Sequence, residues 1–339
     1  MKTTLALLTL LAVSSLFLFQ QENINVEEIS QDAELFQKFN QWIAEHGMYG
    51  SIDIASRFPV WIENYKLVQE HNAQQSDYFL KMTKFAHLTN SEFGELISSY
   101  VPTPASERKY LSSSVKADVP ASVDWVAKGV SGSVQNQGVC GCCWAFSAVQ
   151  TVSSLNAINS GTFTQLSQQQ VVSCDHSLGL NSGCNGGNPL ISMKYYIAKK
   201  GLELDSDYPF EQLDSAVVGE CEYDASKVFY TNGGAKAVAS KDVNAIQAAV
   251  ANGPISIAIN GGSIYFQLYG GGILTNTGCK ANLDHAVNIV GYDTTGSTPY
   301  WNIKNSWGSS WGESGYIRIE IVEGEGICGC QADPSYAFA

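Results

Sequence analysis

Positive charge is scarce in this sequence of 339 residues. Lys and Arg together number 19, against 32 Asp and Glu, so the formal net charge at pH 7 is −13. An acidic surface repels phosphate backbones, which argues against a nucleic-acid partner. The balance fits an acidic, soluble protein, and charge alone does not identify an enzyme.

Long apolar runs are nearly absent as well. The exception lies close to the N-terminus, where Lys2 precedes an apolar run from Leu5 to Phe19 that three hydroxyl residues interrupt. This run is too short for a comfortable membrane span, and together with the polar stretch from Gln20 it is typical of a signal peptide over residues 1–20. An uncleaved anchor is the alternative, because no clean small-x-small cleavage site precedes Gln20. No second run follows, so we expect a mature form without a membrane span.

Residues 25–100 contain no cysteine, whereas nine cysteines stand between Cys140 and Cys330. Cytosolic proteins seldom keep so many cysteines, so the count favours the secretory pathway. The cysteine-free stretch is also richer in charge and helical in pattern, which indicates a separate segment. An Asn-x-Ser/Thr acceptor for N-glycosylation is absent from the chain, so the sequence does not indicate glycosylation.

The most informative stretch is Gln137 to Ser147, in which a cysteine stands directly before a Trp. Apolar residues recur every three or four positions from Trp144 to Ile158, and Gly161 stands where a C-terminal cap belongs, so the pattern predicts a helix. Cys143 then lies in the first turn, where free backbone N–H groups and the helix dipole favour a thiolate. On this stretch alone, a structural role for all three cysteines is an equal alternative.

Histidine is scarce too, which limits the candidates for a catalytic base. Three of the five histidines fall in the N-terminal third, and His176 lies in a polar loop, where a solvated side chain is expected. His285 leads into an apolar run that predicts a strand, and Asn305 ends the strand-like segment Tyr300 to Ile303. A cysteine nucleophile needs a base of this kind, and an amide can orient the ring. Cys143, His285 and Asn305 are therefore the candidate catalytic residues.

These stretches together resemble the papain-like cysteine proteases of the cathepsin L-like group. Further matching blocks are Ser182-Gly183-Cys184-Asn185-Gly186-Gly187, Leu283-Asp284-His285-Ala286 and Asn305-Ser306-Trp307-Gly308. The resemblance covers almost everything after the signal segment. It implies an α+β, two-lobe fold, with a helical left lobe and a β-barrel-like right lobe, preceded by a helical propeptide domain. It also implies a signal peptide over 1–20, an inhibitory propeptide over 25–100, an exposed linker and processing region over 101–117 and a catalytic domain over 118–339.

Two motifs of the propeptide carry this part of the resemblance. The first steps by three or four residues along one face of a predicted helix, through Asp53, Arg57, Trp61, Asn64, Val68 and Asn72. In the second, Lys81, Thr83, Phe85 and His87 stand where the family usually has Gly, Asn, Phe and Asp. Loss of that acid puts a carboxylate trigger for activation in doubt. An imidazole at His87 is one substitute for it, and a solvated histidine is the default interpretation.

The resemblance implies a cysteine endopeptidase, made as an inactive precursor, that works without a cofactor or metal. Cys143 and His285 would share a proton as a thiolate–imidazolium pair and form a thioester with the substrate. The Cys143 N–H and the Gln137 side-chain amide would hold the oxyanion. Asn305 would hold the imidazole, and Trp307 would shield that bond from water. A zinc site is disfavoured because the sulfurs are committed to bridges or catalysis.

The same resemblance assigns substrate-binding positions. They are Gly186, Gly187, Asn188, Pro189, Ala258, Leu283, Asp284, Ala286 and Asp333. Asp333 falls at the floor of the main specificity pocket, where an acidic group permits Arg in some relatives. We therefore expect a mixed preference for hydrophobic residues and Arg, with a solvated carboxylate near the C-terminus as the alternative.

Disulfide pairing also comes only from the resemblance, because spacing does not fix connectivity. The implied pairs are Cys140 with Cys184, Cys174 with Cys221, and Cys279 with Cys328. Cys142 and Cys330 are left over, either as free thiols or paired with one another. The implied partners are protein and peptide substrates, the chain's own propeptide and cystatin-type inhibitors. A monomer is expected, in a lysosome or vacuole or secreted.

Two other classes of function stay open at this point. An acyl-transfer enzyme such as a transglutaminase uses the same chemistry and would incorporate amines. A catalytically silent, binding-only relative is the other alternative, although such relatives typically lose the nucleophile. The presence of Cys143, His285, Asn305 and Gln137 in one chain favours an active protease.

Overall fold

The computed structural model describes residues 26–339 except 75, 109–118, 212–213 and 276–277. The predicted signal peptide and the predicted start of the mature chain lie outside the described residues. None of the helices within these ranges is long and apolar enough to cross a membrane. The chain divides into two compact units, one on either side of the boundary between Glu63 and Asn64.

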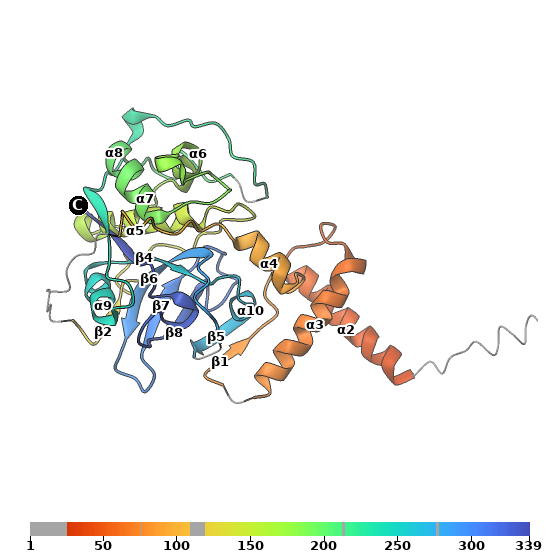
Figure 1. Ribbon diagram of the computed structural model, residues 1–339. Helices are drawn as coiled ribbons and strands as arrows, with labels where there is room; N and C mark the ends of the chain where they lie inside the picture. Colours follow the sequence, from red (N-terminus) through yellow and green to blue (C-terminus); the bar gives the residue numbers. More distant parts are fainter. Residues whose placement is uncertain (1–25, 75, 109–118, 212–213, 276–277) are drawn as a thin grey trace, which may run out of the picture. The chain divides into compact units, whose positions relative to one another are not determined.

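The helices and strands follow one another as a helical first part, a mixed middle and a strand-rich end (Figure 1). The first part holds α2 (Val26–Glu45), α3 (Ile54–Asn72), β1 (Tyr78–Leu80) and α4 (Asn90–Ile97). The middle holds β2 (Ser122–Asp124), α5 (Cys143–Ser160), α6 (Gln168–Cys174), η1 (Ser177–Gly179), α7 (Pro189–Ile191), η2 (Ser192–Ile197), α8 (Ala198–Lys200) and η3 (Ala225–Lys227). The end holds β3 (Gly234–Ala237), α9 (Val243–Asn252), β4 (Ile255–Ile259), α10 (Ile264–Gln267), β5 (Tyr269–Leu274), β6 (His285–Asp293), β7 (Tyr300–Lys304), β8 (Tyr316–Glu320), η4 (Ile327–Gly329) and β9 (Ser335–Phe338).

An aromatic cluster holds the first unit together. Phe39 of α2 is fully buried, and its ring centroid lies 5.8 Å from that of Trp42, 5.2 Å from Phe58 and 5.5 Å from Trp61. Trp61 is the aromatic member of the predicted stripe on α3. Burial of these large rings stabilises the pair of helices through apolar area removed from water.

The polar members of the same stripe hold the chain that follows α3. The Asn64 amide donates to the carbonyls of Ala86, at 2.8 Å, and Leu88, at 3.0 Å. Asn72 donates to the Leu80 carbonyl and accepts from the Leu80 N–H, at 2.8 and 2.9 Å. The helix predicted between residues 53 and 72 is confirmed, and its polar face ties down β1 and the segment before α4.

The strands form a nine-stranded sheet with the order β1-β5-β8-β7-β6-β4-β9-β3, and β2 pairs with β6. Neighbours are antiparallel except β5 and β8, which are parallel. Strands β4 and β6 are almost entirely buried, in keeping with their runs of Ile, Val and Ala. The second lobe was expected to be β-barrel-like. Within the described residues the strand path is open and does not close into a barrel.

Helix α5 is the centre of the helical lobe. It is buried along nearly its whole length, and Gly161 caps it in the left-handed conformation, with φ of 80°, as the sequence predicts. Figure 1 shows the helices α5 to α8 on one side and the strands β4 to β8 on the other. A polar seam joins the two sides, because the Ser147 hydroxyl contacts Ser256 of β4 at 2.6 Å and donates to the Val287 carbonyl of β6 at 2.9 Å. The first residues of α5 and β6 therefore meet at the junction of the lobes.

Candidate active site

Cys143 is the first residue of α5, and no part of it is exposed. Its Sγ accepts a hydrogen bond from the Ala286 N–H at 3.3 Å and lies 3.1 Å from the Ser99 hydroxyl. Ala286 belongs to β6, whereas Ser99 follows α4. The sulfur is therefore enclosed by the helical lobe, the sheet and the N-terminal region together.

His285 is the first residue of β6 and is also fully buried. Its Nε2 lies 2.8 Å from Oδ1 of Asn305, which follows β7, and that same oxygen accepts from the Ser306 N–H at 2.7 Å. Because Oδ1 can only accept, Nε2 is assigned as the donor. The Trp307 ring stacks on the imidazole, with centroids 4.7 Å apart and planes at 28°. The expected trio of His285, Asn305 and Trp307 is thus assembled from the start of β6 and the segment that follows β7.

Burial controls the ionisation of both reactive groups. Desolvation raises the pKa of Cys143 to about 11, against the opposing hydrogen bonds from Ser99 and Ala286. Desolvation also lowers the pKa of His285 to about 4, against the opposing bond to Asn305. Both effects favour the uncharged forms, a thiol and a neutral imidazole. Nδ1 of His285 has no hydrogen-bond partner among the described residues, so the thiolate–imidazolium pair expected from the sequence is not formed in this state.

Gln137 lies beside the start of α5 and is 3% exposed. Its side-chain Nε2 donates to the Cys140 carbonyl at 3.0 Å, and its Oε1 accepts from the Ser306 hydroxyl at 2.6 Å. The two bonds fix the plane of the amide. Sequence reasoning missed the contribution of Ser306, although it stands inside the Asn-Ser-Trp block.

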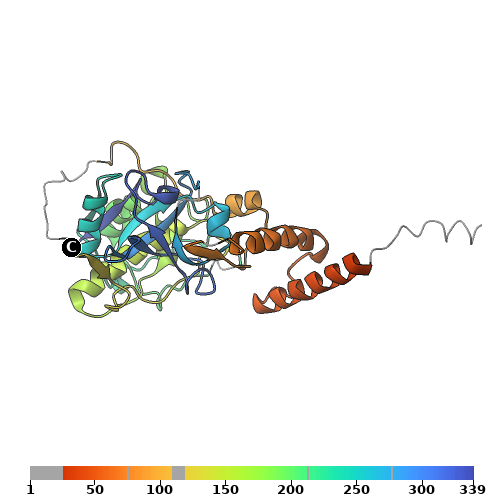
Figure 2. The ribbon, with the colours of Figure 1, turned by 90° about the horizontal axis from the view of Figure 1, so that it is seen from below.

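A segment from the N-terminal region, residues 99–108, crosses the junction of the two lobes, and we call it the crossing segment (Figures 1 and 2). The Ser99 and Tyr100 N–H groups both donate to the Asp284 carbonyl at 3.0 Å. On the other side, the Gly187 N–H donates to the Ser99 carbonyl at 3.0 Å, and Gly187 accepts from the Val101 N–H at 2.8 Å. The crossing segment is therefore held by backbone bonds from both lobes.

Glycine is required on the helical side of this contact. A Cβ at Gly187 would lie 2.5 Å from the Trp144 ring, and one at Gly186 would lie 2.7 Å from the Ser99 carbonyl oxygen. Gly186 also has φ of +106°, which L-residues rarely adopt. Glycine at Gly186 and Gly187 thus leaves room for an extended chain to lie close to the backbone.

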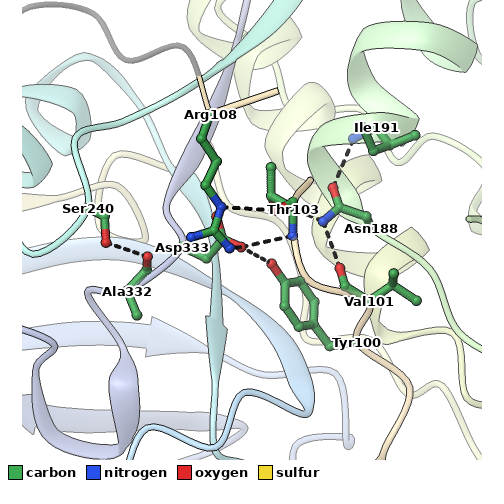
Figure 3. Close-up of polar contacts among 9 residues, drawn as sticks. All are labelled: Tyr100, Val101, Thr103, Arg108, Asn188, Ile191, Ser240, Ala332 and Asp333. Atoms are coloured by element: carbon green, nitrogen blue, oxygen red, sulfur yellow. Dashed lines mark hydrogen bonds and ion pairs between the residues drawn. The ribbon is translucent and has the colours of Figure 1, made fainter. Parts of the chain in front are cut away.

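The Tyr100 side chain lies among residues predicted to line the specificity pocket. It forms one buried apolar cluster with Cys143, Ala258 and Ala286, and Leu283 packs against the edge of the cluster. At the far end of the ring, the hydroxyl donates to Oδ2 of Asp333 at 2.5 Å (Figure 3). The pocket positions predicted on three different elements are therefore brought together around one aromatic ring.

Asn188 and Pro189, two of the predicted substrate-binding positions, lie at the start of α7. Oδ1 of Asn188 caps α7 by accepting from the Ile191 N–H at 3.0 Å, and Pro189 takes the first helical position. Nδ2 of Asn188 donates to the Val101 carbonyl at 2.8 Å and to the Thr103 hydroxyl at 3.0 Å (Figure 3). Asp284, another predicted substrate-binding position, lies directly before β6, and its carboxylate accepts from the Gly261 N–H at 2.7 Å.

The far half of the crossing segment, within the linker expected over 101–117, combines the exposed residues Ala105 and Ser106 with two side chains that contact the catalytic domain. Glu107 accepts from Lys194 Nζ at 2.6 Å and from the Tyr195 hydroxyl at 2.8 Å. Arg108 Nη2 lies 3.2 Å from Oδ2 of Asp333. Composition predicted exposure because it says nothing of partners that are distant in the sequence.

Three disulfides link Cys140 with Cys184, Cys174 with Cys221, and Cys279 with Cys328. They are the pairs that the resemblance implies. Cys142 and Cys330 are free thiols, both buried, so the alternative of a bond between them is not realised. Three disulfides indicate an oxidising compartment of the secretory pathway.

Comparison with known proteins agrees with this geometry. Residues 119–338 match the family model "Papain family cysteine protease", and residues 39–93 match "Cathepsin propeptide inhibitor domain (I29)". The chain is 36% identical over 345 residues to vignain of Ricinus communis, covering 98% of this chain and 92% of vignain. It is 38% identical over 325 residues to the KDEL-tailed cysteine endopeptidase CEP2 of Arabidopsis thaliana, covering 91% and 88%.

Solved precursor structures have the same fold. The proform of the ragweed pollen allergen Amb a 11 matches with a TM-score of 0.81 at 28% identity, over 93% of this chain and 95% of the other. Digestive procathepsin L 3 of Tenebrio molitor matches with a TM-score of 0.81 at 32% identity, over 90% and 99%. The chain therefore belongs to the papain family of cysteine proteases, as a cysteine endopeptidase made in precursor form with a propeptide that inhibits it.

Proposed function

We propose that the mature enzyme cleaves peptide bonds with Cys143 as the nucleophile, His285 as the general base and Asn305 as the group that orients the imidazole. The observation that carries this assignment is the meeting of α5 and β6, where Ala286, next to His285, donates to Sγ of Cys143 at 3.3 Å. The helix start supports a thiolate at Cys143 once the site is open to water. The stacked Trp307 ring protects the bond between His285 and Asn305.

The reaction follows from these positions. The thiolate attacks the substrate carbonyl carbon, and the oxyanion accepts hydrogen bonds from the Cys143 N–H and the Gln137 amide. The imidazolium protonates the leaving amine, which departs and leaves a thioester on the sulfur. His285 then removes a proton from water, and the hydroxide that forms hydrolyses the thioester. Ser306 supports the oxyanion step by fixing the Gln137 amide.

Release of the N-terminal region is the step that opens this site. We place the signal peptide at 1–20, the inhibitory propeptide at 25–100 and the mature catalytic domain at 118–339, with cleavage near residues 116–118. The hydrogen bonds of Ser99 and Tyr100 across the two lobes support the inhibitory role of the region before the cleavage point. Substrate backbone would take the same groups on Gly187 and Asp284 after release.

Substrate selection is proposed to favour hydrophobic residues and Arg at the second position before the cleaved bond. The apolar walls of Ala258 and Ala286 support the first preference. The Arg108 guanidinium on Asp333, at 3.2 Å, supports the second. Rates for matched peptides with Arg or Leu at that position, before and after Asp333→Ala, test this point. An unchanged Arg-to-Leu ratio would contradict it.

The remaining partners follow from the family rather than from a contact in this chain. We propose a monomer that is open to cystatin-type inhibitors and that resides in a lysosome or vacuole or is secreted. The disulfides and the propeptide support a route through the secretory pathway.

One experiment tests the catalytic assignment. Purified precursor is incubated at acid pH with a thiol-directed epoxide, and the labelled residue and the new N-terminus are mapped by mass spectrometry. We expect label on Cys143 alone among the free thiols, and a new N-terminus near residues 116–118. Label on Cys142 or Cys330 instead would overturn the assignment.

A further inference from the structure

Every hydrogen bond that the described residues make to the Asp333 carboxylate comes from the crossing segment. Oδ2 accepts from the Tyr100 hydroxyl at 2.5 Å, from the Thr103 N–H at 3.1 Å and from Arg108 Nη2 at 3.2 Å (Figure 3). When the propeptide leaves, all three donors leave with it. The mature pocket then holds a carboxylate whose partners must come from water or from the substrate.

The carboxylate is buried and rigidly placed. The Asp333 side chain is 5% exposed in the precursor. Its backbone is held on one side by the Ser240 hydroxyl, which donates to the Ala332 carbonyl at 2.6 Å, and on the other by the Val238 N–H, which donates to the Pro334 carbonyl at 2.8 Å (Figure 3). An acceptor fixed in this way keeps its position when the donors change.

The Tyr100 side chain spans the distance between the apolar residues of the pocket and the Asp333 carboxylate. Its ring carbons lie in the apolar cluster with Ala258 and Ala286, and its hydroxyl ends on the carboxylate. Burial first, and the neighbouring Asp333 carboxylate second, raise the pKa of Tyr100 well above its ordinary value, so the hydroxyl stays protonated and donates. The distance from the apolar walls to Asp333 is thus the length of a tyrosine side chain.

We propose that Asp333 accepts a hydrogen bond from the phenol hydroxyl of a substrate tyrosine, so that the mature enzyme selects Tyr over Phe at the second residue before the cleaved bond. This inference rests on the proposed function and goes beyond its preference for hydrophobic residues and Arg. The two side chains differ by one oxygen, so their apolar contacts in the pocket are the same. A Tyr gives the carboxylate a donor, whereas a Phe covers it and leaves it without one.

The size of the effect follows from the cost of an unpaired buried acceptor. Sites built to hydrogen-bond a substrate hydroxyl discriminate strongly against the analogue that lacks it. In the mature enzyme water reaches part of the pocket, which reduces the penalty, so we expect a preference for Tyr over Phe of about tenfold in kcat/KM.

The test uses two fluorogenic peptides that are identical except for Tyr or Phe at this position, cleaved by the mature enzyme. Wild type should favour the Tyr peptide by about tenfold. Asp333→Ala removes the acceptor and should bring the ratio to about one. Asp333→Asn keeps an acceptor oxygen without the charge, so it should retain part of the preference for Tyr while its Arg-to-Leu ratio falls.

A second variant covers the case in which the Asp333 variants fail to fold. Tyr100→Phe removes the same hydroxyl from the precursor and leaves the sequence of the mature domain unchanged. Its Cys143 should react with a thiol-directed epoxide at neutral pH severalfold faster than in the wild-type precursor. Tyr78→Phe is the matched control, because it removes the hydroxyl of another buried tyrosine of the same region, in β1, that does not contact Asp333.

The outcomes distinguish failure of the proposed Tyr preference from failure of the proposed catalytic assignment. A Tyr-to-Phe ratio of one or below in the wild-type enzyme, or a ratio that Asp333→Ala leaves unchanged, would overturn the inference while the protease assignment stands. Cleavage of neither peptide, together with epoxide label away from Cys143, would instead reject the proposed function.

Discussion

Two single residues, Cys143 and His285, carry the chemistry and carry no charge in the precursor. Desolvation raises the pKa of the thiol to about 11 and lowers the pKa of the imidazole to about 4. The thiol therefore keeps its proton, and the imidazole does not gain one, through the neutral range of pH. The Ser99 hydroxyl at 3.1 Å from Sγ marks how closely the crossing segment covers the sulfur. The precursor is thus inactive for two reasons: Cys143 and His285 are uncharged, and the crossing segment covers the sulfur.

The ionisation of Cys143 should change when the propeptide leaves. Because burial is the largest cause of its raised pKa, opening the site to water should move the pKa down and allow the ion pair with His285. Ultraviolet thiolate absorbance, taken as the difference between wild type and Cys143→Ala, measures this residue apart from Cys142 and Cys330. We expect no difference signal in the precursor at neutral pH and a clear one in the mature enzyme. A thiolate signal in the neutral precursor would contradict the prediction.

Ser306 should act on the rate through Gln137. Its hydroxyl fixes the amide with a bond of 2.6 Å, and one such bond contributes about 1 kcal/mol. Ser306→Ala should therefore lower kcat by roughly fivefold to tenfold with little change in KM. Gln137→Ala should cost about a hundredfold, and the double variant should lose no more than Gln137→Ala alone. A kcat of the double variant that is lower than that of Gln137→Ala by the full factor of Ser306→Ala would show that Ser306 acts by another route.

The sequence alone predicted the residues whose side-chain type limits them to a few catalytic roles. It did not predict residues such as Ser306, which act through a hydrogen bond to another residue. Cys143, His285 and Asn305 are recognisable because few side chains supply a nucleophile, a base and an orienting amide. The bond from Ser306 to Gln137 joins positions 169 residues apart. Such a pair is defined only once the chain after β7 lies beside the loop before α5, as the bridge between Asn136 and Trp307 shows.

Among the elements, regular helices were easier to predict than the docked segment. Helix α5 begins at Cys143 and ends before the Gly161 cap. These bounds were predictable because the apolar periodicity and the terminal glycine are local features of the sequence. The crossing segment carries Pro and Ser, which predicted an exposed linker. Its side chains instead find partners on η2 and next to β9, and those partners depend on the tertiary fold.

The contact of Glu107 with η2 should help to hold the propeptide. Lys194 and Tyr195 approach the carboxylate at 2.6 and 2.8 Å, but the lysine side chain is 38% exposed, so screening limits the contribution to about 1 kcal/mol. Glu107→Ala should speed epoxide labelling of Cys143 in the neutral precursor by roughly fivefold.

A matched control for this variant lies in the same region. Glu34 pairs with Lys38 inside α2, at 2.8 Å, with both side chains exposed. Glu34→Ala removes an acidic side chain of the precursor without touching η2, so it should leave the labelling rate unchanged. Equal acceleration in both variants would attribute the effect to net charge rather than to the contact at η2.

For the molecule as a whole, the buried amine of Lys304 joins the two lobes. Lys304 ends β7, and its Nζ donates to the Ser131 carbonyl, to the Gly132 carbonyl at 3.2 Å and to Oε1 of Gln150 at 2.7 Å. Gln150 belongs to α5, so the amine connects the sheet with the central helix. The two-lobe arrangement was predictable from the change of pattern along the chain, but this connection was not, because a lysine in a strand is normally solvated.

The pH dependence of stability should contain a part that belongs to Lys304. Burial lowers its pKa to about 7 in the folded protein, whereas the unfolded chain keeps the ordinary value of about 10.4. Between these values the unfolded state binds the extra proton, so the free energy of unfolding rises with pH across this window and the gain is lost as pH falls to about 7. Lys304→Met should remove that part of the rise. It should also lower stability overall, because three buried acceptors lose their donor.

Urea unfolding in a Cys143→Ala background, which prevents self-digestion, measures this effect at about pH 7 and about pH 9. The remaining free thiols titrate in the unfolded chain at the upper end of this range, but they are the same in both proteins, so their effect cancels in the comparison. We expect the protein with Lys304 to gain more stability between the two conditions than Lys304→Met. Equal gains would mean that the amine keeps its proton in the folded state, and that the three oxygens around it stabilise a charge rather than accept from a neutral amine.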